Sequence, residues 1–260
     1  MFASKYDEML RLSDEERLDV VNDGVKLIQR KNGLTFGTDA LLLAGFIDGT
    51  GNKVCAELGG GTGIISFLLL TRKKAKKIYV YEIQEAFAEL IQRNAIINSL
   101  DEKICVIQKD VRQATSADTC GEVDIVFSNP PYMKAGSGKL NEFTEKTVAR
   151  HEVCGDISDF CKSAARLLKF GGDFYVVYPP DRMAELFDAM KKASIEPKAL
   201  TLVYPTLRHR PCLILCKGKK GAKAGMIQTP PLVINDQNGE SEEYDYIMKN
   251  GEFNELYKKV

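Results

Sequence analysis

The sequence lacks the cysteine and histidine patterns that build disulfide frameworks or zinc sites. Its 260 residues include seven cysteines and two histidines, and the cysteines are spread along the chain without a C-x-x-C pair. Paired, regularly spaced cysteines are what such frameworks and sites require. We therefore expect no metal, and we interpret the cysteines as small buried hydrophobes of a protein in the reducing cytoplasm.

Long apolar runs are also missing. The first ten residues, MFASKYDEML, have neither the basic region nor the apolar stretch of a signal peptide. No uninterrupted apolar stretch approaches the roughly 20 residues that span a bilayer. We expect a soluble, cytoplasmic protein with no membrane partner, and a monomer.

The sequence has no excess of either charge. There are 36 basic residues (Lys and Arg) and 36 acidic residues (Asp and Glu), so a nucleic-acid partner must be bound by local basic patches. With 44% hydrophobic and 28% charged residues, the composition is that of a globular protein. The length suits one large α/β domain with additions.

Short apolar runs alternate with amphipathic segments, which predicts βαβ units and a parallel sheet. The segment PTLRHR joins the last two predicted strands and is too short for a helical crossover, so these strands should pair antiparallel. A seven-stranded, mostly parallel sheet with an antiparallel last strand is the Rossmann-like α/β architecture of class I methyltransferases. The predicted strands are 53–58, 77–82, 103–110, 123–131, 173–178, 197–204 and 211–218, and the predicted helices are 64–72, 84–100, 156–168 and 181–193.

Two flanking segments surround this predicted core of residues 53–218. Residues 1–52 should form a short α/β extension that packs on the cofactor site, with an acidic helix around SDEERLDVV, a strand at VKLIQR and a helix capped by Thr38. Residues 219–260 form a polar C-terminal extension with one apolar island, PPLVI. The role of its acidic end stays open.

A glycine-rich loop, AELGGGTG, joins the first core strand to the first core helix, with Glu57, Gly59, Gly61 and Gly63 in an E-x-G-x-G-x-G pattern. Glycine allows positive φ and lets a ligand approach the backbone closely. Nicotinamide enzymes use a similar loop. Glu57 favours S-adenosylmethionine, because a carboxylate repels a pyrophosphate but can hold a positively charged amino-acid tail.

Two further acids follow the next two strands. Glu82 can accept both ribose hydroxyls, a feature that nicotinamide enzymes share. Asp110 can accept from the adenine amino group, and Val111 can offer its backbone N–H to a ring nitrogen. The alternative is that such acids are solvated turn residues. Three of them at successive strand ends favour a ligand site, because ligands of open α/β sheets bind at these carboxyl ends.

The fourth core strand ends in Asn129-Pro130-Pro131-Tyr132. Proline fixes φ and holds the preceding residue extended, so the turn aims the Asn129 side chain and the Pro130 carbonyl outward. These two acceptors can bind both N–H groups of an exocyclic adenine amine, and Tyr132 can stack on an unstacked or flipped base. Catalysis then comes from positioning and fixed dipoles. The alternative is a proline-stiffened turn that serves packing alone.

ELGGGTG together with NPPY resembles the class I S-adenosylmethionine-dependent methyltransferases that modify amino nitrogens of adenine, guanine or glutamine. Three flanking segments, NGLTFGTDALLLAGF, VARHEVCGDISDFCKSAARLLKFGG and TPPLVINDQNGE, resemble the bacterial tRNA adenine-N6 methyltransferases that act beside the anticodon of valine tRNA. The resemblance runs from about Val25 to Gly239. It implies that Phe36, Gly37, Thr38 and Asp39 line the far side of the cofactor. Glu57 departs from it, since many relatives have aspartate there.

The first hypothesis is therefore methyl transfer to N6 of an adenine in tRNA. Glutamine-N5 methylation of a release factor is the alternative, disfavoured by the short N-terminal segment; rRNA or DNA amino-methylation also remains open, although no target-recognition segment follows the core. A non-catalytic RNA-binding adaptor and a nicotinamide oxidoreductase are further readings. The intact Asn129 and glycines disfavour the adaptor, and NPPY disfavours the oxidoreductase.

RNA should be met by basic residues on the NPPY side of the sheet. The loop between the last two strands leaves the carboxyl end of a parallel strand and should lie there, as should the long segment after NPPY. The basic run RKKAKK (72–77) precedes a strand, so we expect it at the opposite edge as solvated surface. The RNA-binding candidates are Arg208, His209, Arg210, Lys134, Lys139 and Arg150.

Overall fold

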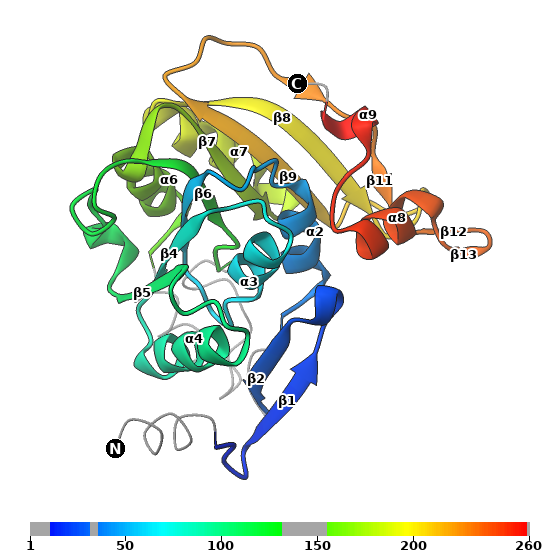
Figure 1. The fold of residues 1–260 in the computed structure, drawn as a ribbon. Coiled ribbons are helices and arrows are strands. Elements are labelled where there is room, and N and C mark those ends of the chain that lie inside the picture. The colour runs from blue at the N-terminus through cyan, green and yellow to red at the C-terminus, as the bar shows by residue number, and fades with distance from the viewer. Residues whose placement is uncertain (1–10, 32–35, 132–154, 259–260) are drawn as a thin grey trace, which may run out of the picture.

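The structure, a computed structural model, describes residues 11–31, 36–131 and 155–258. One twisted sheet runs through its centre (Figure 1). Seven strands follow the order β8-β9-β7-β6-β3-β4-β5. Their bounds are β3 (Val54–Leu58), β4 (Lys77–Glu82), β5 (Ile104–Gln108), β6 (Val123–Ser128), β7 (Leu168–Tyr178), β8 (Ile195–Tyr204) and β9 (Leu213–Lys220).

The predicted pairing of the last two core strands is confirmed. β9 lies between β7 and β8 and pairs antiparallel with both, while β3, β4, β5, β6 and β7 pair in parallel. The prediction of seven strands is two short, because β10 (Ile227–Gln228) and β11 (Leu232–Val233) add to β8 in parallel and make nine. These strands come from the segment after the core, where two-residue pairings carry no periodic signal.

Alternate residues of each strand point to opposite faces of the sheet, so the sheet separates two hydrophobic cores. On β3, Cys55 packs on one side of the sheet and Ala56 and Leu58 on the other. Helices α2 (Thr38–Phe46), α3 (Ile64–Thr71) and α4 (Glu85–Ile97) cover the first side, and α6 (Ile157–Leu167) and α7 (Met183–Lys192) cover the second. None of the helices in the described ranges is long and apolar enough to cross a membrane.

The predicted acidic helix near the N-terminus is wrong. Residues Glu16–Val20 form β1, which pairs antiparallel with β2 (Lys26–Arg30) through the turn η1 (Asn22–Gly24). The edge of β2 is bound by α4, since Asn94 bonds both the N–H and the C=O of Ile28. Tertiary contacts thus override the helical propensity of the acidic segment.

Thr38 does not cap its helix. Gly37 occupies the N-cap position of α2 with an extended backbone and has no side chain to bond the free N–H groups. Thr38 is the first helical residue and is exposed. The prediction was wrong by one residue.

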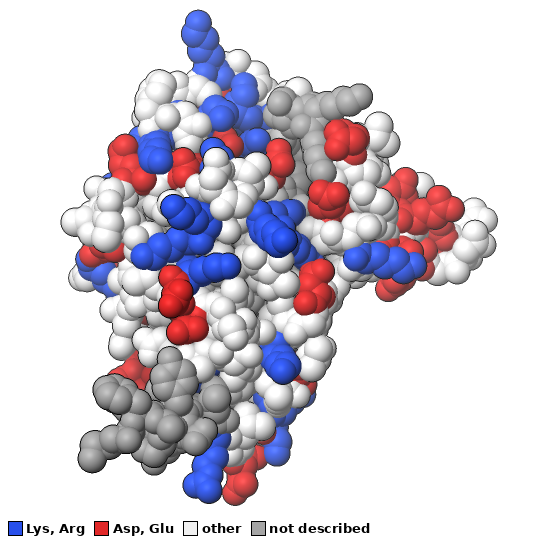
Figure 2. Space-filling view, in the orientation of Figure 1, with Lys and Arg blue, Asp and Glu red and all other residues white. Residues whose placement is uncertain are grey.

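The C-terminal segment folds onto the far end of α2. It forms β12 (Asn235–Asp236), β13 (Gly239–Glu240), α8 (Glu242–Asn250) and α9 (Glu255–Lys258). Tyr244, Phe253 and Tyr257 are buried, and the rings of Phe253 and Phe46 meet edge to face with their centroids 5.5 Å apart. Acidic side chains gather on the protruding part around α8, whereas both signs are mixed over the rest of the face in Figure 2. The boundary at residue 218 stays a prediction.

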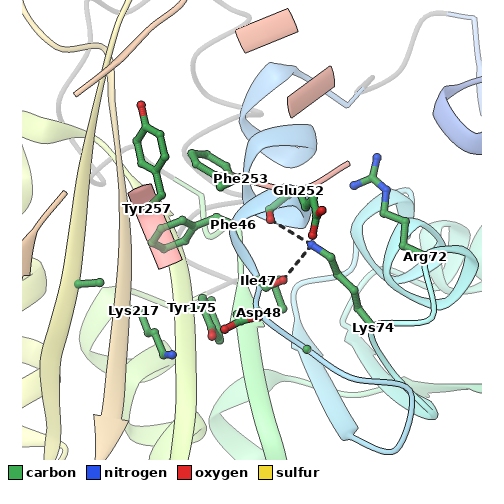
Figure 3. A pocket seen from close by; sticks show the side chains of 13 residues that line it. Phe46, Ile47, Asp48, Arg72, Lys74, Tyr175, Lys217, Glu252, Phe253 and Tyr257 are labelled. Atoms are coloured by element: carbon green, nitrogen blue, oxygen red, sulfur yellow. Dashed lines mark hydrogen bonds between the residues drawn. The ribbon is translucent and has the colours of Figure 1, made fainter. Parts of the chain in front are cut away.

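The basic run 72–77 is not simply solvated surface. The Lys74 ammonium donates to the carbonyl oxygens of Ala44, Gly45 and Ile47 at 3.0–3.1 Å, where α2 ends (Figure 3). Arg72 pairs with Asp23 at 2.8 Å. These contacts border a cavity of about 190 Å³ at the opposite edge of the sheet from the predicted site. Cations at a helix C-terminus are favourable because its carbonyls carry partial negative charge.

Candidate active site

The predicted site residues meet at one edge of the sheet. β3, β4, β5 and β6 are parallel neighbours whose registers place Leu58 beside Tyr81, Glu82 beside Gln108, and Glu57 beside Phe127. All four strands therefore end at the same edge. Glu82 ends β4, and the glycine loop, Asp110 and Asn129 follow the ends of β3, β5 and β6, so the structure places these predicted residues at one edge of the sheet. Their roles stay predictions.

The glycine loop is built against the end of β4. The backbone N–H groups of Gly59 and Gly60 both donate to the Tyr81 carbonyl oxygen, at 2.9 and 3.0 Å. Gly63 adopts a left-handed conformation, with φ of 79°, and starts α3. A side chain is excluded at Gly60, where a Cβ atom would lie 2.3 Å from Val80 Cγ1 and 2.9 Å from Ile91 Cδ1.

Gly60→Ala is therefore expected to lower the free energy of unfolding by about 1–3 kcal/mol, the usual cost of overpacking a core. The matched control is Gly61→Ala, since a Cβ there meets nothing within 4 Å. It should cost about 1 kcal/mol, because Gly61 has a φ of +54°. Chemical denaturation measures both. Equal losses of stability would contradict the packing argument.

Glu57 is buried, with 1% of its surface exposed. Ser66 Oγ on α3 donates to Glu57 Oε2, and burial raises the pKa of this carboxyl to about 8. The carboxyl is thus a neutral acid at pH 7 until a cation comes near it. Sequence reasoning did not identify Ser66, because nothing in an apolar helix marks one serine as a partner of a strand residue.

Glu82 holds the glycine loop in place. Its Oε2 accepts from the Gly61 N–H at 2.9 Å, and its Oε1 accepts from the Gln84 N–H at 2.8 Å. Burial raises the pKa of this carboxyl as well. A carboxylate has about four acceptor positions, so the two bonds leave room for hydroxyl donors from a ligand.

Asp110 binds its own neighbour. It caps the turn η2 (Val111–Gln113) by accepting from the Arg112 N–H at 2.8 Å, and it pairs with the Arg112 guanidinium. Hydrogen bonding to that guanidinium lowers the pKa of Asp110. The carboxylate stays ionised, but an adenine amino group has to share it with Arg112.

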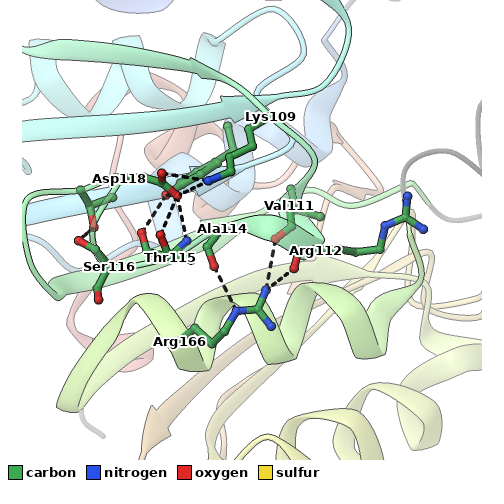
Figure 4. A network of polar contacts seen from close by, with 10 residues as sticks. Lys109, Val111, Arg112, Ala114, Thr115, Ser116, Asp118 and Arg166 are labelled. Carbon is green, nitrogen blue, oxygen red and sulfur yellow. Dashed lines mark hydrogen bonds and ion pairs between the residues drawn. The ribbon is translucent and has the colours of Figure 1, made fainter.

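A polar network holds the segment that carries Asp110 and Val111 (Figure 4). Arg166 of α6 donates to the carbonyl oxygens of Ala114 at 3.0 Å and Arg112 at 2.8 Å. Asp118 accepts from Lys109 at 2.9 Å. Sequence reasoning missed Arg166, since it is one of many basic residues on amphipathic helices.

The Asn129 turn is tied to both neighbouring segments. Ser128 Oγ, fully buried, donates to the Leu58 carbonyl oxygen at 2.7 Å, which links the end of β6 to the glycine loop. The Asn129 Nδ2 group donates to Asp39 Oδ2 at 2.9 Å. Pro130 is buried and Pro131 is half-buried. Phe36 is half-buried at the start of α2, close in sequence to Asp39.

The candidate RNA-binding residues fall into two groups. Arg208, His209 and Arg210 are exposed on the loop between β8 and β9, which follows the carboxyl end of β8 at the same edge as Asn129. Leu207 at this loop is 74% exposed and was missed by sequence reasoning. The remaining predicted residues, Tyr132, Lys134, Lys139 and Arg150, lie outside the described residues.

An open sheet with the order β8-β9-β7-β6-β3-β4-β5, an antiparallel β9 and a glycine loop at the switch point defines a class I methyltransferase fold. A predicted O-methyltransferase from Agrobacterium tumefaciens has this fold, with a TM-score of 0.65 and 22% identity over 82% of this chain and 96% of that one. The chain belongs to the methyltransferase small domain family, whose model matches residues 31–195. The resemblance seen in the motifs is thereby confirmed.

Two relatives carry a more specific name. The tRNA1(Val) (adenine(37)-N6)-methyltransferase of Porphyromonas gingivalis is 28% identical over 156 residues, which cover 58% of this chain and 60% of that protein. The protein of the same name from Bacteroides thetaiotaomicron is 29% identical over 167 residues, covering 64% and 67%. The chain thus spans about 60% of the length of the first of these relatives.

Proposed function

We propose that this protein is an S-adenosylmethionine-dependent methyltransferase that modifies N6 of an adenine in tRNA. One observation carries the proposal: Asn129 follows the strand beside the glycine loop, and because its amide nitrogen donates to Asp39 at 2.9 Å, its oxygen is the end of the amide that can accept from a planar amine. The names of the relatives support the choice of tRNA, and of the adenine next to the anticodon.

The residues around the glycine loop fit S-adenosylmethionine. Two buried carboxyl groups, Glu57 and Glu82, have raised pKa values because of burial, and a cationic ligand relieves that cost. A Cβ at Gly61 would meet nothing within 4 Å, so the loop backbone is open to a ligand. When bound, this cofactor supplies an electrophilic methyl group on a sulfonium.

Each residue then has a role in binding. Glu57 balances the charge of the amino-acid tail, and Glu82 accepts from the ribose hydroxyls through the positions not used by the loop. Asp110 and the Val111 N–H receive the adenine edge. Phe36, Thr38 and Asp39, at the start of α2, close the far side.

The Asn129 turn is proposed to make the adenine amino group a better nucleophile. An adenine amino group spreads its lone pair into the ring. When the Asn129 oxygen and the Pro130 carbonyl accept from its two N–H groups, the nitrogen is held in place and its lone pair is directed at the methyl group. Fixed dipoles that are set before the reaction stabilise the charge that develops during it. Tyr132 is proposed to stack on the flipped base.

The β8–β9 loop is proposed to contact RNA. The double variant Arg208→Ala with Arg210→Ala should raise the KM for tRNA about tenfold. It should also lower the slope of log KM against log salt concentration by about 2, because two phosphate contacts are lost. The kinetics at several salt concentrations measure this. The matched control is Lys103→Ala with Lys192→Ala, two exposed lysines near strand ends at the opposite edge. Equal effects of both pairs would argue against a specific surface.

The choice of position is tested with two transcripts of valine tRNA that differ in one base. A transcript with adenine at position 37 should accept the methyl group, and one with guanine at that position should not. Methylation of both transcripts to the same extent would place the target elsewhere in the molecule.

A further inference from the structure

We propose that Asp39 is a positioning residue that decides which end of the Asn129 amide faces the acceptor base. The inference rests on the proposed function and adds to it a part for the N-terminal helix α2. It differs from the role of Asp39 as a lining residue of the cofactor site, because it acts through Asn129.

The contact joins two segments that lie 90 positions apart in the chain. Asn129 Nδ2 donates to Asp39 Oδ2 at 2.9 Å. A carboxylate accepts hydrogen bonds and donates none, so the nitrogen end of the amide is the end that fits against Asp39. The oxygen end is thereby turned away from Asp39.

The orientation matters because the two ends of the amide have opposite character. An amine N–H needs an acceptor, which the oxygen end supplies. A flipped amide would bring its own N–H groups against those of the substrate. The terminal torsion of asparagine is broad and nearly two-fold, so the contact with Asp39 favours the orientation in which the nitrogen faces Asp39.

The Asp39 carboxylate is itself fixed. Its Oδ1 accepts from the Ala40 N–H at 2.9 Å in the first turn of α2, and Leu42 and Leu43 of this helix are fully buried. Gly37 leaves the space that Oδ1 occupies, since a Cβ at Gly37 would lie 2.6 Å from it. Gly37→Ala is therefore a way to displace the carboxylate without removing its charge.

The kinetic test separates positioning from cofactor binding. Asp39→Ala and Gly37→Ala should lower kcat about 10- to 100-fold, with the Kd for S-adenosylmethionine within about threefold. Asp39→Asn should have a kcat between those of the wild type and Asp39→Ala, because its single oxygen can accept from Asn129 only by giving up the bond from the Ala40 N–H. The matched control is Asp48→Ala, an exposed carboxylate just after the other end of α2, which should leave kcat unchanged. A weakened Kd with unchanged kcat would overturn the proposal and make Asp39 a cofactor ligand.

Exchanging the two side chains gives a sharper test. Asn129→Asp alone brings two carboxylates together, so its turnover should be low and should rise as the pH falls, when one of them takes up a proton. In the double variant, Asp39→Asn with Asn129→Asp, the new amide at position 39 donates to the new carboxylate at position 129. The turnover of the double variant should be at least about tenfold higher than that of Asn129→Asp, and it should not rise as the pH falls. A double variant no better than Asn129→Asp would overturn the proposal.

The contact between Asp39 and Asn129 can also be measured without RNA, so its test does not depend on the proposed function. In protein labelled with ¹⁵N-asparagine, Asn129→Asp identifies the side-chain NH₂ signal of Asn129. This signal should shift in Asp39→Ala and stay in place in Asp48→Ala. An unmoved signal in Asp39→Ala would overturn the positioning contact, whereas a shifted signal in a protein that methylates no RNA would refute only the proposed substrate.

Discussion

Asn129→Ala is expected to lower kcat for tRNA methylation by about 10²- to 10³-fold, the effect of removing one fixed dipole from a preorganised site. The Kd for S-adenosylmethionine should change by less than about threefold, because Asn129 follows β6, whereas the carboxyl groups and the glycine loop proposed to hold the cofactor lie on β3 and β4 or in the segments after β3 and β5. Single-turnover kinetics with saturating tRNA and a separate calorimetric titration of the cofactor measure the two quantities.

The control for this variant is Asn238→Ala, an exposed asparagine in the turn between β12 and β13. It should leave both quantities unchanged. Wild-type turnover of Asn129→Ala would contradict the acceptor mechanism. Loss of cofactor binding in this variant would instead make Asn129 a cofactor-binding residue.

Glu57→Gln should have opposite effects on stability and binding. The neutral amide resembles the protonated carboxyl that burial favours, so the ligand-free protein should be more stable at pH 8 by on the order of a few kcal/mol. The same change removes the charge that balances the cofactor's tail, and the Kd for S-adenosylmethionine should rise about 10- to 100-fold. Thermal unfolding and calorimetry measure the two effects.

The sign of the pH dependence follows from the raised pKa. Burial raises the pKa of Glu57 from 4.5 to about 8, so between these values the folded protein holds a proton that the unfolded chain has lost. Stability of the ligand-free protein should fall as pH rises through this window and level off above it. Glu82 shifts in the same direction. Carboxyls with lowered pKa values, such as Glu16 and Asp110, contribute fully above about pH 5 and do not oppose the trend.

The pH profile also distinguishes the wild-type protein from the variant. Wild-type affinity for the cofactor should increase from pH 6 to pH 8, because less work is needed to ionise Glu57, and Glu57→Gln should show a flatter profile. A Tm of the ligand-free wild-type protein that rises over the same interval would contradict the assignment of Glu57 as a buried neutral acid.

The sheet and the site edge were predictable because their signals are local. Short apolar runs such as those of β3 and β6, which are buried along almost their whole length, and the glycine or proline that follows them, predict both the strand and its end. The short PTLRHR connection fixed the antiparallel pairing of β8 and β9. Once the strands are parallel neighbours, the convergence of Glu82, Asp110 and Asn129 follows from topology alone.

The missed features depend on contacts between distant segments. The strand β1 forms because β2 and α4 provide partners for it, with Arg93 of α4 pairing with Glu16 at 2.6 Å. The sequence of the C-terminal extension is mostly polar and predicts a polar surface segment, yet Phe253 and Tyr257 are buried in the structure. The bond between Asp39 and Asn129 joins side chains 90 positions apart, and one sequence contains no signal for such a pair.

The central claim is that the Asn129 turn presents acceptors to N6 of an adenine in tRNA. Its most direct test is to incubate the purified protein and S-adenosylmethionine with tRNA from a strain that lacks the enzyme, and to analyse the digested nucleosides by mass spectrometry. The account predicts N6-methyladenosine as the product, absent with Asn129→Ala. Methyl groups found on guanine N2, or on glutamine of a release factor and not on tRNA, would contradict it.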